Sequence, residues 1–442
     1  MKKTWMLLLA ALLCLGAAGL LNRPLLARRE AFRPPNQTDL RQAPPMVAFT
    51  TVALGGFRGI LADLLWLRVS SLQEAGQYFE VTQLSEWITK LEPTFSEVWS
   101  YHAWNMAYNI GYLFDQPADR WRWVDKALRM LREEGIRYNP GDPRLYGDVG
   151  WMYFNKIGGF MDTAAGYYQF RLYQSLESVL PGGRLSGGDP ATATRLREAS
   201  ALDAGVMAAL ERVTGPLDWR LPESHALYWA WSGRAICGGA PDLFLERLFY
   251  QAMIASCFRG GVVCVAARQV WVRTVRTDLF EPALAVLDEA VRRFPDDPGI
   301  LTARNNFLRL AVVQGYAHGD EARASRFLAR FRQEEPKAPA DLAAFVGAEV
   351  DSGNLVAPGF AEQMEGLFFE GALARRQGRP AAADRLDDVA VRIFESVRRR
   401  AAREGQPFQI TLDPIRERGR MQAFEVPDGT GKTDLIIKGP NP

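Results

Sequence analysis

The feature that most constrains the fold is a set of small and large residues that recurs at fixed spacing near the C-terminal end of the chain. Three segments share the same steps between such positions: Gly319, Ala324, Phe331 and Pro336; Gly378, Ala383 and Ala390; and Ala283, Leu287, Ala290 and Pro295. A small residue lets two helices approach, a large residue fills the gap beside it, and a proline ends the second helix. The pattern predicts consecutive helical hairpins.

Composition is compatible with a large helical protein. The chain has 442 residues, of which 48% are hydrophobic, so wholesale disorder is excluded. A net charge of +2 gives no general attraction to nucleic acid, and we expect no nucleic-acid partner. Many of the tryptophans crowd into one stretch, which we expect to be the most heavily packed: Trp66, Trp87, Trp99, Trp104, Trp121, Trp123 and Trp151.

The N-terminus carries an apolar segment. Lys2 and Lys3 precede a run without charge from Thr4 to Leu21, which is long enough to span a bilayer or to serve as the apolar region of a signal peptide. We expect an uncleaved transmembrane anchor over residues 1–22, because the apolar run continues past the small residues 16–18. Cleavage after those residues is the alternative.

Charge around the apolar segment gives a weak indication of topology. The two N-terminal lysines favour a cytoplasmic N-terminus, whereas Arg23, Arg28, Arg29 and Arg33 place comparable charge on the other side. We expect a single-pass protein of the bacterial inner membrane, with its bulk on the periplasmic side.

A second apolar stretch, residues 46–67, contains Arg58 and Asp63. Charges in the middle of a membrane span are costly, so we expect a buried soluble helix here. The boundaries that follow from composition are 1–22 anchor, 23–46 Pro/Arg-rich linker, 47–180 Trp-rich helical domain, 181–190 loop, 191–402 helical solenoid, and 403–442 C-terminal tail.

No alternating run predicts a strand before the tail. In the tail, the segments 408–412 (FQITL) and 434–438 (DLIIK) predict either a short strand pair or a disordered end. Outside the apolar N-terminal run, Cys237, Cys257 and Cys264 lack the spacing of a zinc site. We expect buried free thiols, with a Cys257–Cys264 disulfide as the alternative.

The recurring positions resemble the tetratricopeptide repeat (TPR), which has small residues at fixed places and a proline near its end. Gly371, Gly378, Ala383 and Ala390 match four of those places. The resemblance implies an all-α, right-handed TPR-like solenoid behind the N-terminal transmembrane helix. Trp271 departs from it, because it stands where the repeat has a small residue.

The front half resembles a family of uncharacterised, membrane-anchored bacterial TPR-like proteins. The resemblance implies no assigned activity. It depends on four strings of residues: LGGFRGILADLLWLR (54–68), ITKLEPTFSEVWSYHAWNMAYNI (88–110), RWRWV (120–124) and NKIGGFMD (155–162).

A polar stripe follows one face of the helix expected from about residue 95. His102, Asn105 and Asn109 share this face, and asparagine side chains can both donate to and accept from a peptide backbone. The alternative is a buried stripe that satisfies neighbouring helix ends. No nucleophile or carboxylate can be assigned beside His102, and the three histidines of the chain do not form a metal-binding pattern.

In TPR-like arrays the first helix of each hairpin lines a concave groove. Mapping the matched repeats places a row of mostly basic residues on that side: Arg268, Arg276, Asn306, Arg309, Arg375 and Arg376. Such a groove would bind acidic peptides or a terminal carboxylate through charge-assisted hydrogen bonds. The alternative is a solvated face on which these arginines pair with nearby Asp and Glu.

These features predict a non-catalytic, membrane-tethered scaffold that binds a protein or peptide partner, without a cofactor or metal. A second possibility is an accessory subunit of a membrane transport, secretion or envelope-polysaccharide machine, which has one obligate partner. A third is a carbohydrate- or lipid-acting enzyme, which would need exposed Trp99, Trp104 and Trp121 with converging carboxylates.

Overall fold

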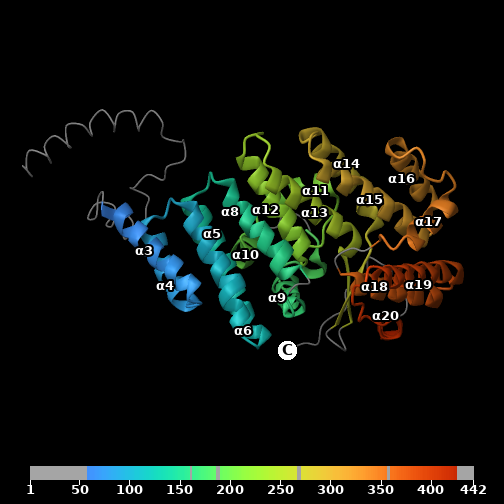
Figure 1. The fold of residues 1–442 in the computed structure, drawn as a ribbon, viewed down its shortest axis with the longest axis horizontal. Helices are drawn as coiled ribbons and strands as arrows, with labels where there is room; N and C mark the ends of the chain where they lie inside the picture. The colour runs from blue at the N-terminus through green and yellow to red at the C-terminus, as the bar shows by residue number, and fades with distance from the viewer. Residues whose placement is uncertain (1–56, 160–161, 186–189, 266–269, 356–358, 426–442) are drawn as a thin grey trace, which may run out of the picture. The chain divides into compact units, whose positions relative to one another are not determined.

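The computed structural model describes residues 57–159, 162–185, 190–265, 270–355 and 359–425 (Figure 1). In these ranges the protein is predominantly helical and contains one pair of short strands, which confirms the all-α class. The chain divides into two compact units, residues 1–98 with 137–141 and residues 99–136 with 142–442.

The first unit is built on a helical hairpin. Its described elements are α3 (Phe57–Glu74), α4 (Tyr78–Leu91), the first turn of α5 (Ser96–Trp104) and the end of α7 (Ile136–Tyr138). Helices α3 and α4 pack together, with Val69 and Leu72 of α3 buried, as are Val81 and Ile88 of α4. The Asn139 amide donates to the Pro93 carbonyl over 2.9 Å and ties the short second segment to the hairpin.

The prediction of a buried helix over residues 46–67 is wrong in the described part. Phe57, Ile60 and Leu64 of α3 are exposed, because α4 covers only one face of a helix that is apolar on two. No helix within the described ranges is long and apolar enough to cross a membrane. The predicted anchor over residues 1–22 lies outside those ranges.

The front of the second unit is a set of helices, three of which run into π-helical turns. Proline at the first helical position and aspartate N-caps mark several starts, as at Asp142, Asp203 and Asp242. The elements are α5, η1 (Asn105–Ile110), η2 (Gly111–Leu113), α6 (Pro117–Met130), η3 (Leu131–Gly135), α8 (Pro143–Trp151), η4 (Met152–Ile157), α9 (Ala165–Glu177), η5 (Pro181–Gly183), α10 (Pro190–Ser200), α11 (Ala204–Thr214), α12 (Pro222–Ile236) and α13 (Leu243–Arg259).

The back of the second unit begins with two strands and continues in helices. Helix α14 packs on α15, α15 on α16 and α17, and α18 on both α19 and α20. The elements are β1 (Gly261–Val265), β2 (Val270–Thr274), η6 (Thr277–Leu279), α14 (Phe280–Arg293), α15 (Pro298–Ala317), α16 (Glu321–Glu334), α17 (Leu342–Asp351), α18 (Phe360–Arg376), α19 (Pro380–Arg403) and α20 (Leu412–Glu425).

The recurring glycines end the first helix of a hairpin. Gly76, Gly319 and Gly378 have φ of +71°, +79° and +72°, a left-handed conformation that glycine adopts without steric cost. After α15 the amides of Gly319 and Asp320 bond back to the carbonyls of Tyr316 and Gly315, and equivalent pairs of bonds follow α3 and α18. This is the Schellman motif, and it gives the three hairpins the same turn.

The small residues that follow these turns are buried at the helix contacts. Ala324 and Ala383 have no exposed surface. A Cβ atom on Gly315 would lie 3.2 Å from the Cβ atom of Ala324, so α15 and α16 approach closely at this point. The spacing in the sequence therefore predicted the two hairpins α15–α16 and α18–α19 correctly.

The hairpin predicted over residues 260–295 is wrong in its first half. Strands β1 and β2 pair antiparallel there, with Gly261 opposite Thr274 and Cys264 opposite Trp271. Both runs are rich in β-branched residues, which favour strands. They do not alternate with polar residues, because β2 packs between α13 and α18. Trp271 therefore departs from the repeat pattern because it lies on a strand.

The C-terminal tail also differs from its prediction. Residues 408–411 form no strand, and α20 covers α18 through a glycine contact: a Cβ atom on Gly419 would meet the Glu365 carbonyl oxygen at 2.6 Å. The segment 434–438 lies outside the described residues. Cys257 is buried with a free thiol, as the favoured alternative required.

A buried ionic network joins the front of the second unit to the back. The Glu223 carboxylate of α12 binds Arg273 of β2 at 2.7 Å and Arg259 of α13 at 3.2 Å. Arg259 also binds Glu362 of α18 at 2.8 Å and donates to the Gly158 carbonyl after η4. Burial alone would raise the pKa of Glu223, but the two arginines hold it below its usual value.

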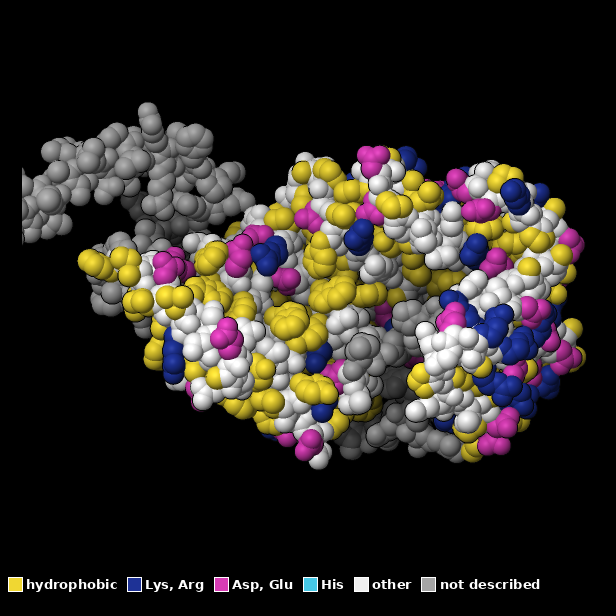
Figure 2. All heavy atoms as spheres, viewed as in Figure 1, with side chains coloured by type: hydrophobic (Ala, Val, Ile, Leu, Met, Phe, Trp, Pro, Cys, Tyr) yellow, Lys and Arg dark blue, Asp and Glu magenta, His cyan; other side chains and the backbone are white. Residues whose placement is uncertain are grey.

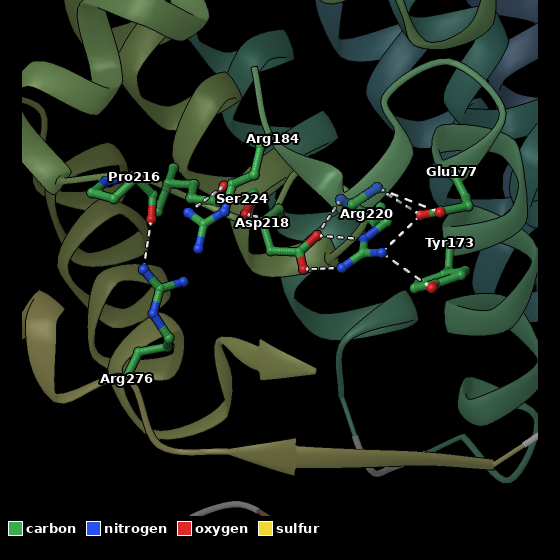
Figure 3. Close-up of polar contacts among 10 residues, drawn as sticks. Tyr173, Glu177, Arg184, Pro216, Asp218, Arg220, Ser224 and Arg276 are labelled. Atoms are coloured by element: carbon green, nitrogen blue, oxygen red, sulfur yellow. Dashed lines mark hydrogen bonds and ion pairs between the residues drawn. The ribbon is translucent and has the colours of Figure 1, made fainter. Parts of the chain in front are cut away.

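A second polar cluster holds the start of the predicted 181–190 loop (Figure 3). Arg220 is buried and binds Asp218 at 2.6 Å, Glu177 of α9 at 2.7 Å and the Tyr173 hydroxyl at 3.1 Å. Gly183 follows with φ +68°, and a Cβ atom there would lie 2.0 Å from Asp218 Oδ1. Only glycine fits beside this cluster, so the first part of the loop has a fixed path.

Glu223→Ala is expected to lower the free energy of unfolding by about 3–5 kcal/mol, because it removes the carboxylate that neutralises two buried arginines. Glu289→Ala is the matched control, since Glu289 pairs with Arg292 on an exposed surface, where a pair contributes about 0.5 kcal/mol or less. Urea denaturation of both variants measures the difference. Equal effects would show that the network does not support the fold.

Candidate docking surface

A row of aromatic side chains crosses the front of the second unit. The Trp104 ring stacks on Tyr108 at 4.8 Å, Trp151 makes a side-chain hydrogen bond with Tyr108, and the Trp151 ring lies 6.2 Å from both Phe154 and Phe244. We call Trp104, Tyr108, Trp151, Phe154 and Phe244 the aromatic row. Its two ends are open to solvent, with Trp104 51% and Phe244 44% exposed.

The row depends on positions where the backbone makes room for a ring. A Cβ atom on Gly147 of α8 would lie 2.7 Å from Phe244 Cε1, so this glycine provides the seat for the Phe244 ring. Hydrophobic side chains gather over α5 and α8 on the face shown in Figure 2. The row thus lies on a surface formed by α5, α8 and the start of α13.

Two π-helical turns fix the middle of the row. The Tyr108 hydroxyl of η1 donates to Asn155 Oδ1 of η4 over 3.1 Å. Burial raises the pKa of Tyr108, and the negative charge of Asp148 raises it further, so the phenol stays protonated. Asp148 itself accepts a hydrogen bond from Ser100, and burial raises its pKa. π-Helical turns are frequent at functional sites.

An ionic cluster lies directly behind the row. Asp162 binds the Lys156 ammonium at 2.7 Å and Arg120 at 3.1 Å, and it accepts from the Tyr168 hydroxyl at 3.1 Å. Lys156 is buried, and its ammonium lies 5.0 Å from the centre of the Tyr108 ring. Burial opposes the charge on Asp162, but hydrogen bonds from Lys156 and the Ala164 amide lower its pKa. The cluster holds Tyr108 from behind.

The structure brings together three of the strings that carry the family resemblance. Tyr108 comes from the string 88–110, Arg120 from 120–124, and Lys156 and Asp162 from 155–162. Sequence reasoning did not single out these four residues, although the unusual strings that contain them were a signal. Phe244 had no such signal, because its exposure depends on a glycine nearly a hundred residues away.

The predicted polar stripe lies inside the helical packing. His102 and Asn105 are buried, and the Asn109 amide donates to Asn105 Oδ1 over 2.9 Å. These contacts fit the buried alternative rather than a grip on a peptide. The stripe and the aromatic row share the helix α5–η1 but occupy different faces of it, since Trp104 and Tyr108 are one turn apart on the exposed side.

The predicted groove residues are not gathered in one place. Arg276 lies in the loop after β2, where it binds Asp278 at 2.6 Å and donates to the Pro216 carbonyl at 3.0 Å (Figure 3). Arg309 of α15 lies 3.6 Å from Glu349 and against the Phe331 ring. Asn306 is exposed on α15. Arg268 lies outside the described residues.

The two remaining groove arginines bind within their own hairpin and its cover. Arg375 binds Asp384 at 2.6 Å and lies 3.4 Å from Asp387, both on α19. Arg376 donates to the Ala423 carbonyl of α20. The described groove arginines therefore have carboxylate or carbonyl partners, which agrees with the solvated-face alternative.

The features needed for the enzymatic alternative do not come together. Trp99 is buried against Gly135, and Trp121 is half-buried against Tyr168, so the three tryptophans share no exposed pocket. Within the described ranges, no group of three or more His, Cys, Asp or Glu side chains could hold a metal ion. No protein-family model matches the chain, and no curated protein is significantly similar to it.

Asp162→Asn is expected to destabilise the protein by about 3 kcal/mol near neutral pH, because it leaves the Lys156 charge buried without its carboxylate. The folded-state pKa of Asp162 is lowered. Its contribution is therefore complete above the unfolded pKa of about 4, and it is lost as the pH falls through the folded pKa. Urea denaturation from pH 7 to pH 3 should show the two proteins converging at the acid end.

Asp119→Asn is the control for this comparison. Asp119 pairs with Arg122 at 3.0 Å on an exposed surface of α6, and its replacement should change stability by about 0.5 kcal/mol or less. A constant difference between wild type and Asp162→Asn down to pH 3 would contradict the assigned role of Asp162.

Proposed function

We propose that the protein is a non-catalytic, membrane-tethered scaffold that holds a protein partner on a TPR-like array of helical hairpins. The aromatic row is the docking surface. The observation that carries the proposal is the pair of exposed rings, Trp104 and Phe244, joined by half-buried aromatics on a backing that the Asp162 cluster fixes.

Three physical arguments support docking through this row. Large exposed aromatics in a contiguous group are typical of interaction sites. Tryptophan, tyrosine and phenylalanine are enriched in interfaces, because they bury much surface with little loss of conformational entropy. The ion pairs behind the row hold the rings in place before a partner binds, which lowers the cost of association. A partner segment with apolar side chains fits this chemistry.

The TPR-like architecture is supported by the shared Schellman turns at Gly76, Gly319 and Gly378. Identical turns between hairpins of similar length are what a repeat array requires. The membrane tether is residues 4–21, and the bulk of the chain would lie in the periplasm. The groove arginines do not contribute to this proposal, since each described one is engaged within the fold.

Photo-crosslinking tests the docking surface. A photoreactive amino acid placed at position 104 or at position 244 of the full chain, in native membranes, should capture the same protein at both positions. The same group at position 289, on the exposed surface of α14, should not. Capture of unrelated proteins at the two positions, or equal capture at position 289, would contradict docking through the aromatic row.

Trp104→Ala and Phe244→Ala are expected to reduce copurification of that captured protein about thirtyfold each, because a central aromatic in an interface contributes about 2 kcal/mol. Both rings are largely exposed, so thermal unfolding should change little. A partner that stays bound in one-to-one amount through all purification steps would favour the obligate accessory subunit over an exchangeable scaffold.

A further inference from the structure

Helix α3 carries an exposed apolar face in the first unit. At 100° per residue, five large apolar side chains over three turns fall on one side of the helix. We call this set the α3 stripe: Phe57, Ile60, Leu61, Leu64 and Leu67, which are 75%, 58%, 41%, 58% and 70% exposed. Figure 2 shows hydrophobic side chains along α3. Monomeric proteins rarely leave such a row in water.

The stripe is not the face that holds the hairpin together. Ala62, Val69 and Leu72 lie on the opposite side of α3 and are buried in the packing with α4. Helix α3 is therefore apolar on two sides, and the hairpin uses one. The second side needs another apolar environment.

The occupant that the chain favours is the surface of a lipid bilayer. The stripe begins 36 residues after Leu21, the last residue of the uncharged N-terminal segment. A linker of that length reaches at most about 120 Å when extended, so the proposed tether keeps α3 close to the membrane surface. Among the described elements, α3 is the first after that segment.

The charges of α3 allow it to lie on a membrane but not to cross one. Asp63 and Arg68 are exposed along the helix, and charges at both heights exclude a span. Arg68 lies one turn beyond Leu64, beside the stripe, where a long cationic side chain can extend to lipid phosphates. A helix with an apolar face and polar flanks lies in the interface, with its apolar side about 5–10 Å deep.

We propose that α3 is a membrane-interface helix: the stripe inserts into the headgroup and acyl boundary of a phospholipid bilayer, and it gives the first unit a second attachment besides the tether. This inference depends on the proposed tether, because one helix of this size binds a bilayer weakly unless a second signal holds it there.

The test uses the full chain reconstituted into vesicles of phosphatidylethanolamine and phosphatidylglycerol. An environment-sensitive fluorescent amino acid replaces Leu64 in the stripe or, as the control, Ser70 on the exposed polar side of α3. At position 64 we expect a blue-shifted emission that lipids with a shallow nitroxide group quench. At position 70 we expect quenching by iodide in the water phase.

A stripe variant provides the second arm. Phe57→Gln, Ile60→Gln and Leu67→Gln together remove apolar surface while keeping good helix formers, so circular dichroism should be unchanged. Flotation with the vesicles should persist through residues 4–21, whereas the label at position 64 should lose its quenching by lipid. This loss separates insertion of α3 from the tether.

Each other outcome overturns the inference. Iodide quenching at position 64 would place the stripe in water, and protection from both quenchers would show that a protein surface or a second copy covers it. Failure of the full chain to float would overturn both the tether and this inference. Failure of crosslinking at position 104 would contradict the docking surface alone and leave the assignment of α3 in place.

Discussion

The second unit depends on one carboxylate that neutralises two buried arginines. Glu223 binds Arg259 and Arg273, and through them the end of η4, strand β2 and helix α18 are joined to α12. A buried network of this kind is stable only when every charge is matched, so it specifies one arrangement of these elements more sharply than apolar packing alone. The docking surface lies on helices that this network holds from behind, since α8 and η4 both pack on α12.

Sequence spacing predicted the hairpins well where one local rule was sufficient. Gly319 and Gly378 stand at helix ends because a left-handed turn needs glycine, and Ala324 and Ala383 follow because two helices touch there. The same reasoning was wrong at β1 and β2, where strands buried on both sides lose the alternation that identifies them. It was also wrong for α3, because an apolar pattern shows which residues avoid water but not whether protein or another phase covers them.

The candidate site shows a similar limit. The strings around Tyr108, Arg120 and Asp162 were recognised as unusual, yet their meeting at one ionic cluster depends on contacts between segments some forty residues apart. The arginine groove was predicted from repeat positions that assumed a helix where the chain forms a β-hairpin. Mapping side chains by repeat position is reliable only within hairpins that have the repeat's own turn.

The π-helical turns at residues 105–110, 131–135 and 152–157 have a consequence for how the front of this protein can vary. A π turn holds one residue more than an α turn, so deleting a single residue there would restore an ordinary helix. The side chains on one side of the deletion would then rotate by about 100° relative to those on the other. Tyr108 and Asn155 could no longer meet. Related chains should therefore exchange residues in these segments far more readily than they change length.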